Sequence, residues 1–206
     1  KRVFVTGHTG FKGRWLCEWL RMLGAEVNGF SLPDDILVSS YLDGRMHGQE
    51  IIFHLAAQAL VRASYADPLG TYATAGLGTA NVLQLAPKGA RIVCVTSDKV
   101  YKQCPPTDWS VPCPFVEEHE LGGVDPYSAS KAAAELVIAS YRDGFGVNAA
   151  SARAGNCIGG GDMAPDRLIP DAVRAHEVRT PFAVRSPYAT RPWQHVCEPL
   201  CGYLLL

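Results

Sequence analysis

Two side chains with opposite acid–base chemistry, Asp98 and Lys99, follow an apolar run that has the composition of a buried strand. A carboxylic acid kept protonated can donate a proton, and an amine kept neutral can accept one. Burial favours both neutral forms, because it disfavours charge. Neighbouring side chains on a strand point to opposite faces, so the two groups reach one substrate only if the chain leaves its sheet here. The alternative interpretation is a surface ion pair, which contributes little to stability.

A tyrosine and a second lysine, Tyr127 and Lys131, lie four residues apart in the segment DPYSASKAAAELV. On a helix this spacing puts both side chains on one face. The ordinary pKa of a tyrosine is about 10, so it needs a nearby cation to act as a base at neutral pH. Lys131 would supply one cation, and an oxidised nicotinamide would add another. The pair therefore indicates proton transfer; the alternative is two exposed residues on an amphipathic helix.

Three glycines, Gly7, Gly10 and Gly13, separate an apolar run from a helical pattern. Glycine permits a tight turn and lets backbone N–H groups approach a pyrophosphate at the positive end of a helix. At the start of a strand–helix–strand unit, such a loop predicts dinucleotide binding. The acidic residue that reads the adenine ribose usually lies about 20 residues further on, at the end of the second strand. Asp34 and Asp35 come too late for this role, so the sequence leaves NAD and NADP both open.

The elements that must position these groups alternate between apolar runs and helical patterns, which is typical of a parallel α/β sheet. We expect strands over residues 2–6, 26–30, 51–55, 91–96 and 147–153, and helices over 11–23, 68–85 and 127–141. Asp125-Pro126 would cap the last helix and Gly144 would end it. Residues 31–50 contain no convincing helix–strand pair, so this region is either compacted or lacks residues. Residues 104–114 and 159–162 have the composition of loops.

Composition excludes several classes of protein. The 206 residues suffice for one large domain, or for one domain with a small second one. The formal net charge of −1 indicates no basic surface for binding nucleic acid or a membrane. No apolar run approaches the roughly 20 residues of a membrane span, and no signal peptide precedes Lys1. Seven scattered cysteines without a C-x2-C pair indicate reduced, mostly buried thiols in a cytoplasmic protein. Because the chain stops in an apparent helix, we expect a longer parent protein.

The glycine loop, the Tyr127/Lys131 pair and the segment HLAAQ at residues 54–58 together resemble the extended short-chain dehydrogenases/reductases. The segments VTGHTGFKG, TSDKVY, GGVDPYSASKAAAELV, RAGNCIGGGDMAPDRLIPD and RPWQHVCEPLCGYLLL resemble the nucleotide-sugar 4,6-dehydratases within that family. The resemblance implies an α/β fold, a Rossmann-type doubly wound parallel sheet with a small, incomplete substrate-binding cap. We expect a dinucleotide-binding domain over residues 1–158, an incomplete nucleotide-sugar-binding region over 159–206, and a homodimer formed through the helices near 68–85 and 127–141.

The same resemblance implies an internal redox dehydration, with NAD as cofactor (NADP not excluded) and CDP-glucose as substrate. Tyr127 would take the 4-hydroxyl proton while hydride leaves C4, and Lys99 would then take the C5 proton as Asp98 assists loss of water. Hydride returned to C6 would complete a 4-keto-6-deoxy sugar. Lysine at position 99, where relatives carry glutamate, suggests a CDP-sugar. A nucleotide-sugar epimerase, which would not need the Asp98–Lys99 step, and a non-catalytic NAD(P)-binding relative are the alternatives.

The resemblance assigns three groups of site residues and no metal ligands. The catalytic group is Ser97, Asp98, Lys99, Tyr127 and Lys131. The cofactor-binding group is Gly7, Thr9, Gly10, Phe11, Gly13, Leu55, Ala56, Ala57, Thr96, Tyr127 and Lys131. The substrate-binding group is Gln58, Arg62, Asn156, Leu168, Arg185 and Arg191. One departure is Ala75, which stands where the family usually has an architectural asparagine, and it keeps the non-catalytic alternative open.

Overall fold

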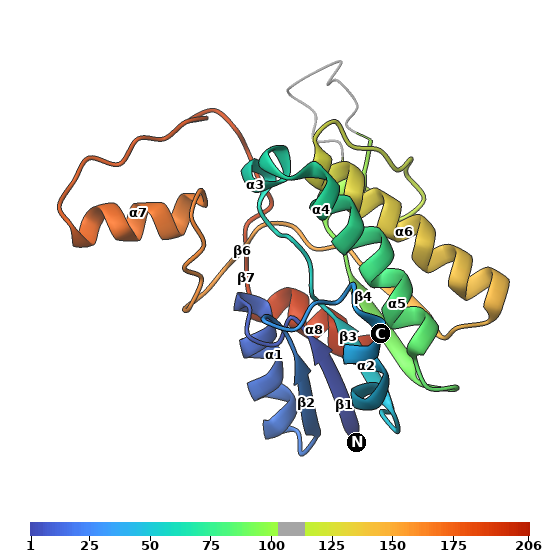
Figure 1. Ribbon diagram of the computed structural model, residues 1–206. Coiled ribbons are helices and arrows are strands. Elements are labelled where there is room, and N and C mark those ends of the chain that lie inside the picture. Colours follow the sequence, from blue (N-terminus) through green and yellow to red (C-terminus); the bar gives the residue numbers. More distant parts are fainter. Residues whose placement is uncertain (103–113) are drawn as a thin grey trace.

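A five-stranded parallel sheet forms the centre of the computed structural model, which describes residues 1–102 and 114–206 (Figure 1). The strand order is β2-β1-β3-β4-β5, and each neighbouring pair is parallel. The strands are β1 (Arg2–Thr6), β2 (Glu26–Phe30), β3 (Ile51–His54), β4 (Arg91–Val95) and β5 (Ala149–Ala152). All five predicted strands are therefore confirmed, although β3 and β4 each end one residue earlier than predicted and β5 is shorter at both ends. Residues 103–113, with Cys104, Cys113 and most of the expected loop at 104–114, lie outside the described residues.

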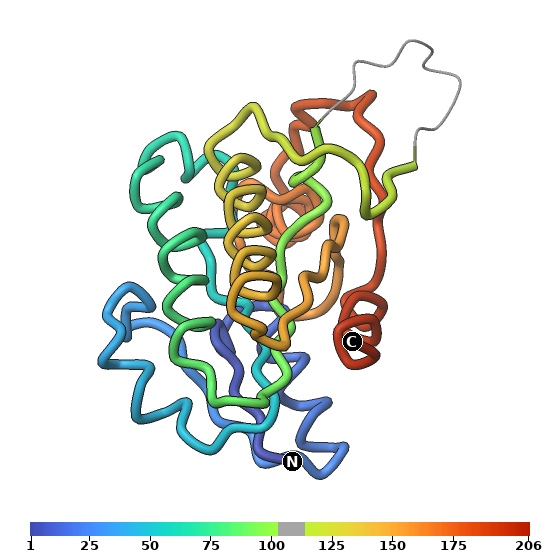
Figure 2. The backbone as a smooth tube through the Cα atoms, turned by 90° about the vertical axis from the view of Figure 1, so that its right-hand side faces the viewer, coloured from blue at the N-terminus to red at the C-terminus, as the bar shows by residue number. Residues whose placement is uncertain are grey.

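Alternating side chains on the strands give the sheet a hydrophobic core on each face. Val3 and Val5 of β1 face one core, and Phe4 between them faces the other. The first core is covered by α1 (Phe11–Met22) and α8 (Cys197–Leu205), and the second by α2 (Ser39–Met46), α5 (Gly78–Leu85) and α6 (Pro126–Phe145). Figure 2 shows the two helical layers from the side, with the N-terminal strands between them. The predicted doubly wound fold is confirmed.

The region 31–50 is compacted, but it does contain a helix. In α2, Leu42 and Met46 lie one turn apart and are fully buried against the second core. This helix is hard to predict from the sequence, because it has only 8 residues and no side-chain cap. No strand forms within residues 31–50, all of which the structure describes, so β2 lies at the edge of the sheet.

The helix predicted over residues 68–85 is continuous but not uniform. It consists of α4 (Pro68–Tyr72), a π-helical turn (Ala73–Leu77) and α5. Ala75, the residue that departs from the family pattern, is buried in the π-helical turn. Such turns interrupt the regular helical spacing, often near functional sites.

The helix α6 begins as expected and ends two residues later than expected. The Asp125 carboxylate accepts a hydrogen bond from the Ser128 amide at 2.9 Å, and Pro126 occupies the first turn. Gly144 remains helical, so its predicted role as the terminator is wrong. Gly146 ends the helix instead, because it adopts the left-handed conformation with φ of 69° that glycine tolerates best.

The C-terminal third of the chain leaves the sheet and then returns to it. The strands β6 (Cys157–Ile158) and β7 (Gln194–His195) form a small parallel ladder, and between them α7 (Leu168–Glu177) projects outward on extended segments (Figure 1). After β7, α8 packs on the first core. Five cysteines are described and all are free; Cys17 and Cys94 are buried, whereas the other three are not, so the expectation of mostly buried thiols is only partly met. Among the described helices, none is long and apolar enough to cross a membrane.

Candidate active site

The carboxyl ends of the parallel strands open onto one large cavity, of about 1570 Å³. In open α/β sheets, ligands bind at this edge of the sheet. Every site residue predicted from the sequence lies on the wall of the cavity. The loops after β1, β3, β4 and β5 supply the floor, while the segments on either side of α7 supply the outer wall.

The glycine loop after β1 is built for close backbone approach. A Cβ atom added at Gly13 would lie 2.1 Å from the Gly7 carbonyl oxygen, and one added at Gly7 would lie 2.8 Å from the Ala56 nitrogen. Gly10 is the N-cap residue of α1, and no side chain caps this helix. The first N–H groups of α1 therefore face the cavity without a side-chain acceptor, which suits the pyrophosphate of a dinucleotide.

A buried histidine holds the neighbouring segment 55–57 against the glycine loop. His54 Nδ1 lies 2.7 Å from Thr6 Oγ1, and His54 Nε2 lies 3.0 Å from Thr79 Oγ1. Thr6 Oγ1 also accepts a hydrogen bond from the Ala56 amide at 3.1 Å. This chain of contacts joins β1, β3 and α5 directly beneath the cavity.

The chain leaves the sheet at the end of β4, as the acid–base interpretation of Asp98 and Lys99 requires. β4 ends at Val95, and a 3₁₀ turn over Asp98–Val100 brings both side chains to the cavity wall. Ser97 Oγ donates a hydrogen bond to Asp98 Oδ1 at 3.1 Å. Among the ion pairs of the described residues, none joins Asp98 to Lys99, so the alternative of a surface ion pair gains no support. Both side chains are only partly buried, less than the sequence interpretation assumed.

Tyr127 and Lys131 of α6 face the same cavity, and Lys99 Nζ lies 6.0 Å from the centre of the Tyr127 ring. The Lys131 ammonium is buried and donates a hydrogen bond to the Val95 carbonyl at 3.1 Å. Burial lowers the pKa of Lys131 to about 8, and the nearby Lys12 charge adds to the effect. Burial raises the pKa of Tyr127 above its ordinary value, while contact with Ser97 and the Lys12 charge partly oppose the rise. A cation beside Tyr127 is therefore needed for it to act as a base.

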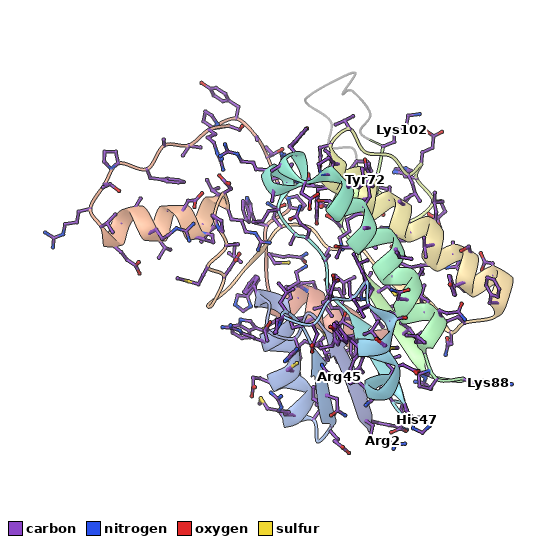
Figure 3. All side chains as sticks on the ribbon, in the orientation of Figure 1. Arg2, Arg45, His47, Tyr72, Lys88 and Lys102 are labelled. Carbon is purple, nitrogen blue, oxygen red and sulfur yellow. The ribbon has the colours of Figure 1, made fainter. Side chains whose placement is uncertain are left out.

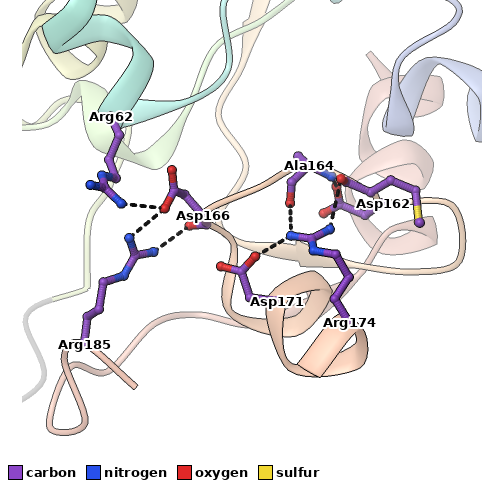
Figure 4. Close-up of polar contacts among 8 residues, drawn as sticks. Arg62, Asp162, Ala164, Asp166, Asp171, Arg174 and Arg185 are labelled. Carbon is purple, nitrogen blue, oxygen red and sulfur yellow. Dashed lines mark hydrogen bonds and ion pairs between the residues drawn. The ribbon is translucent and has the colours of Figure 1, made fainter. Parts of the chain in front are cut away.

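Two of the three arginines predicted to bind substrate are engaged with a carboxylate of the outer wall. Arg62 Nη1 lies 2.8 Å and Arg185 Nη1 2.7 Å from Asp166 Oδ1 (Figure 4). Beside this cluster, Arg174 pairs with Asp171 and donates to the Ala164 carbonyl at 3.2 Å. Asp166 thus holds the two guanidinium groups together, and guanidinium groups are suited to bind phosphate oxygens.

The remaining predicted substrate residues differ in their surroundings. The Gln58 side chain is used in its own turn, where its amide nitrogen donates to the Leu60 carbonyl at 2.8 Å. Arg191 donates to the Thr190 carbonyl at 2.6 Å, while Asn156 and Leu168 line the cavity.

Lys12 and Asp166 are among the charged residues of the cavity wall that sequence reasoning missed. Lys12 had a usable signal, because a cation in the first turn of a helix opposes the helix dipole. Asp166 had none, since its positive φ of 62° and its position between two arginines follow from tertiary structure.

Comparison with known proteins defines the class. Residues 3–200 match the model of the NAD dependent epimerase/dehydratase family, and the chain belongs to this family. Within it, the chain is 43% identical to CDP-glucose 4,6-dehydratase of Salmonella typhimurium (strain LT2), over an alignment of 241 positions that covers all of this chain and 66% of that protein. The alignment is longer than the 206 residues of this chain, so the relative has segments that this chain lacks.

Solved structures give the same class. DesIV, a dTDP-glucose 4,6-dehydratase from Streptomyces venezuelae solved with NAD bound, is 25% identical with a TM-score of 0.85, covering 100% of this chain and 71% of that one. RMD from Pseudomonas aeruginosa, solved with NADPH, is 27% identical with a TM-score of 0.83, covering 99% and 70%.

Proposed function

We propose that this chain catalyses the 4,6-dehydration of CDP-glucose to CDP-4-keto-6-deoxyglucose with NAD as its cofactor. One observation carries the proposal: the Lys99 amine lies 6.0 Å from the Tyr127 ring, on the same cavity as the uncapped end of α1. An epimerase would need Tyr127 but not a second base beside it. The 43% identity to a CDP-glucose 4,6-dehydratase supports the same choice of sugar nucleotide.

The proton transfers of the reaction are divided among Tyr127, Lys99 and Asp98. Tyr127 takes the proton of the sugar 4-hydroxyl, and the Lys131 charge beside it stabilises the tyrosinate. When bound, NAD would accept hydride from C4 and return it at C6, so that none is consumed overall. Lys99 takes the proton from C5, which the neighbouring C4 ketone has made acidic. Asp98 then donates a proton to the departing 6-hydroxyl, which leaves as water, and Lys99 returns its proton to C5 as C6 receives hydride.

The outer wall would hold the nucleotide. Arg62, Arg185 and Arg191 offer guanidinium groups to the diphosphate and its surroundings, with Gln58, Asn156 and Leu168 beside them. We propose that residues 1–158 bind the cofactor and that residues 159–206 bind the nucleotide sugar, although α8 also packs on the first core. Free thiols at the five described cysteines support a cytoplasmic location.

Mass spectrometry of CDP-glucose incubated with the protein and NAD tests the proposal. A product lighter by one water is expected. Lys99→Met should oxidise C4 without elimination, so the absorbance of reduced cofactor should build up, whereas Lys88→Met, at an exposed site away from the cavity (Figure 3), should behave as wild type. An isomer of unchanged mass would establish an epimerase instead, and cofactor binding without any product would establish the non-catalytic alternative.

We also propose a homodimer, formed through α4, α5 and α6. Leu69 of α4, Leu77 of the π-helical turn and Leu136 of α6 have exposed fractions of 80%, 55% and 64%, which supports an apolar contact through these helices. Light scattering at micromolar concentration should give twice the chain mass, and Leu136→Glu should give a monomer. Leu23→Glu, at an exposed site at the end of α1, is the matched control. A monomeric wild-type mass would exclude the dimer.

A further inference from the structure

A lysine stands in the first turn of α1, within the glycine loop, where the helix dipole opposes a positive charge. Lys12 is the second residue of this helix, and its side chain is half-buried on the cavity wall. A cation in the first turn costs stability, because it is repelled by the positive end of the helix dipole. Holding a long side chain in one conformation also costs conformational entropy. Because a lysine stands here despite both costs, we expect its charge to have a function in the cavity.

The Lys12 ammonium is held by the C-terminal helix. Its Nζ donates a hydrogen bond to Tyr203 Oη at 3.2 Å and lies 5.8 Å from the centre of the Tyr203 ring. Tyr203 is itself buried in the first core, so it holds the Lys12 ammonium in a fixed position. Burial lowers the pKa of Lys12, but the interactions with Tyr203 and Cys157 outweigh burial and leave the pKa above its ordinary value. Lys12 is therefore charged at neutral pH.

This charge acts on the reactive end of the cavity. Lys12, Tyr127 and Lys131 line the same cavity, and the Lys12 charge lowers the pKa of both Tyr127 and Lys131. In the proposed reaction, Tyr127 touches the hydroxyl on the same sugar carbon that gives up hydride. The nicotinamide ring must contact that carbon, so its place is also beside Tyr127 and within the field of Lys12.

We propose that Lys12 weakens the binding of the oxidised cofactor relative to the reduced one, and so makes the bound nicotinamide a stronger hydride acceptor. The inference rests on the proposed function, because it needs a nicotinamide beside Tyr127. The oxidised ring carries a positive charge that the Lys12 ammonium repels, whereas the reduced ring is neutral. A second cation, Lys131, lies one helical turn from Tyr127, and its buried ammonium adds to the repulsion.

A simpler role for Lys12 is to bind the pyrophosphate, and it makes a different prediction. Both forms of the cofactor carry the same pyrophosphate, so a phosphate ligand would strengthen the binding of NAD+ and NADH equally. ADP-ribose carries the pyrophosphate without the nicotinamide, and it would then respond to loss of Lys12 in the same way as the two cofactors.

Dissociation constants of NAD+, NADH and ADP-ribose, measured by calorimetry for wild type and Lys12→Met, separate the two roles. We expect the ratio of the NAD+ constant to the NADH constant to fall about 10-fold in Lys12→Met, with ADP-ribose unchanged. Lys12→Arg should keep the wild-type ratio, and Lys12→Gln repeats the test if the methionine variant does not fold. Arg21→Met removes a charge from the exposed far end of the same helix and should leave all three constants unchanged.

An unchanged ratio in both Lys12→Met and Lys12→Gln would overturn the inference, as would equal weakening of all three ligands. Failure of the proposed function has a different signature. A shifted ratio without conversion of CDP-glucose would support the inference and remove only the dehydratase activity. Wild-type protein that binds neither cofactor would remove both.

Discussion

The buried histidine beneath the cavity should make this protein sensitive to mild acid. His54 lies between Thr6 and Thr79, with one hydroxyl contact at each ring nitrogen, at 2.7 Å and 3.0 Å. A neutral imidazole satisfies both contacts, since one nitrogen donates and the other accepts. Burial, with a smaller contribution from the Lys131 charge, lowers the pKa of His54 from 6.5 to about 3. The folded protein therefore keeps this ring neutral where the unfolded chain protonates it.

The direction of the effect follows from this difference. Because the folded pKa is the lower one, the contribution of His54 to stability is complete above about pH 6.5 and is lost as the pH falls toward 3. Within that window, each pH unit costs about 1.4 kcal/mol. Between pH 6.5 and pH 5, the free energy of unfolding should fall by about 1.5 kcal/mol through this residue alone.

Urea unfolding of wild type and His54→Gln at several pH values between 7 and 5 measures the effect. The variant should be less stable at pH 7, because the amide fits the two hydroxyl groups poorly, but it should lose this part of the pH dependence. His47→Gln removes an exposed histidine (Figure 3) and is the matched control. If His54→Gln keeps the wild-type slope over this range, His54 is not the residue that unfolding protonates.

Three further predictions concern the elements around the site. Glu135→Gln should lower the free energy of unfolding by about 3 kcal/mol, because it leaves the Arg153 guanidinium, 2.8 Å away, without its buried partner; urea unfolding unchanged within 1 kcal/mol would contradict this. Asp125→Ala should cost about 1 kcal/mol in the same assay through loss of the α6 cap, whereas Asp125→Asn should cost less. Asp166→Asn should tighten CDP binding in calorimetry about threefold, since it frees two guanidinium groups, and weaker binding would mean that Asp166 holds them in the binding geometry.

Long elements with strong patterns were predictable from the sequence, and short ones were not. The central strands are nearly continuous apolar runs, as in any sheet covered on both faces, so their positions are visible in one sequence. The helix α2 was missed because Leu42 and Met46 are its only buried residues. The terminator of α6 was misplaced because two glycines stand close together, and only the backbone conformation distinguishes Gly144 from Gly146.

The site was predictable where chemistry depends on spacing along one element. The pair Tyr127 and Lys131 is fixed by one helical turn, and Asp98 and Lys99 are adjacent, so both pairs could be identified before the fold was known. Whether a predicted substrate-binding side chain is already hydrogen-bonded within the protein was not predictable in this way. Gln58 is occupied within its own turn, which depends on local backbone geometry and not on residue type.

The charge around Tyr127 shows why the rest required a structure. Its phenol is influenced by Lys12 from α1, by Asp98 at the end of β4 and by Arg167 ahead of α7, three segments that are distant in the sequence. Every cation added there helps Tyr127 to lose a proton, and every one also opposes the positive nicotinamide that the same cavity must hold. Lys131, whose pKa burial lowers to about 8, is one of these cations. The acid–base behaviour of the site is therefore a property of the whole cavity, and no single motif of the sequence determines it.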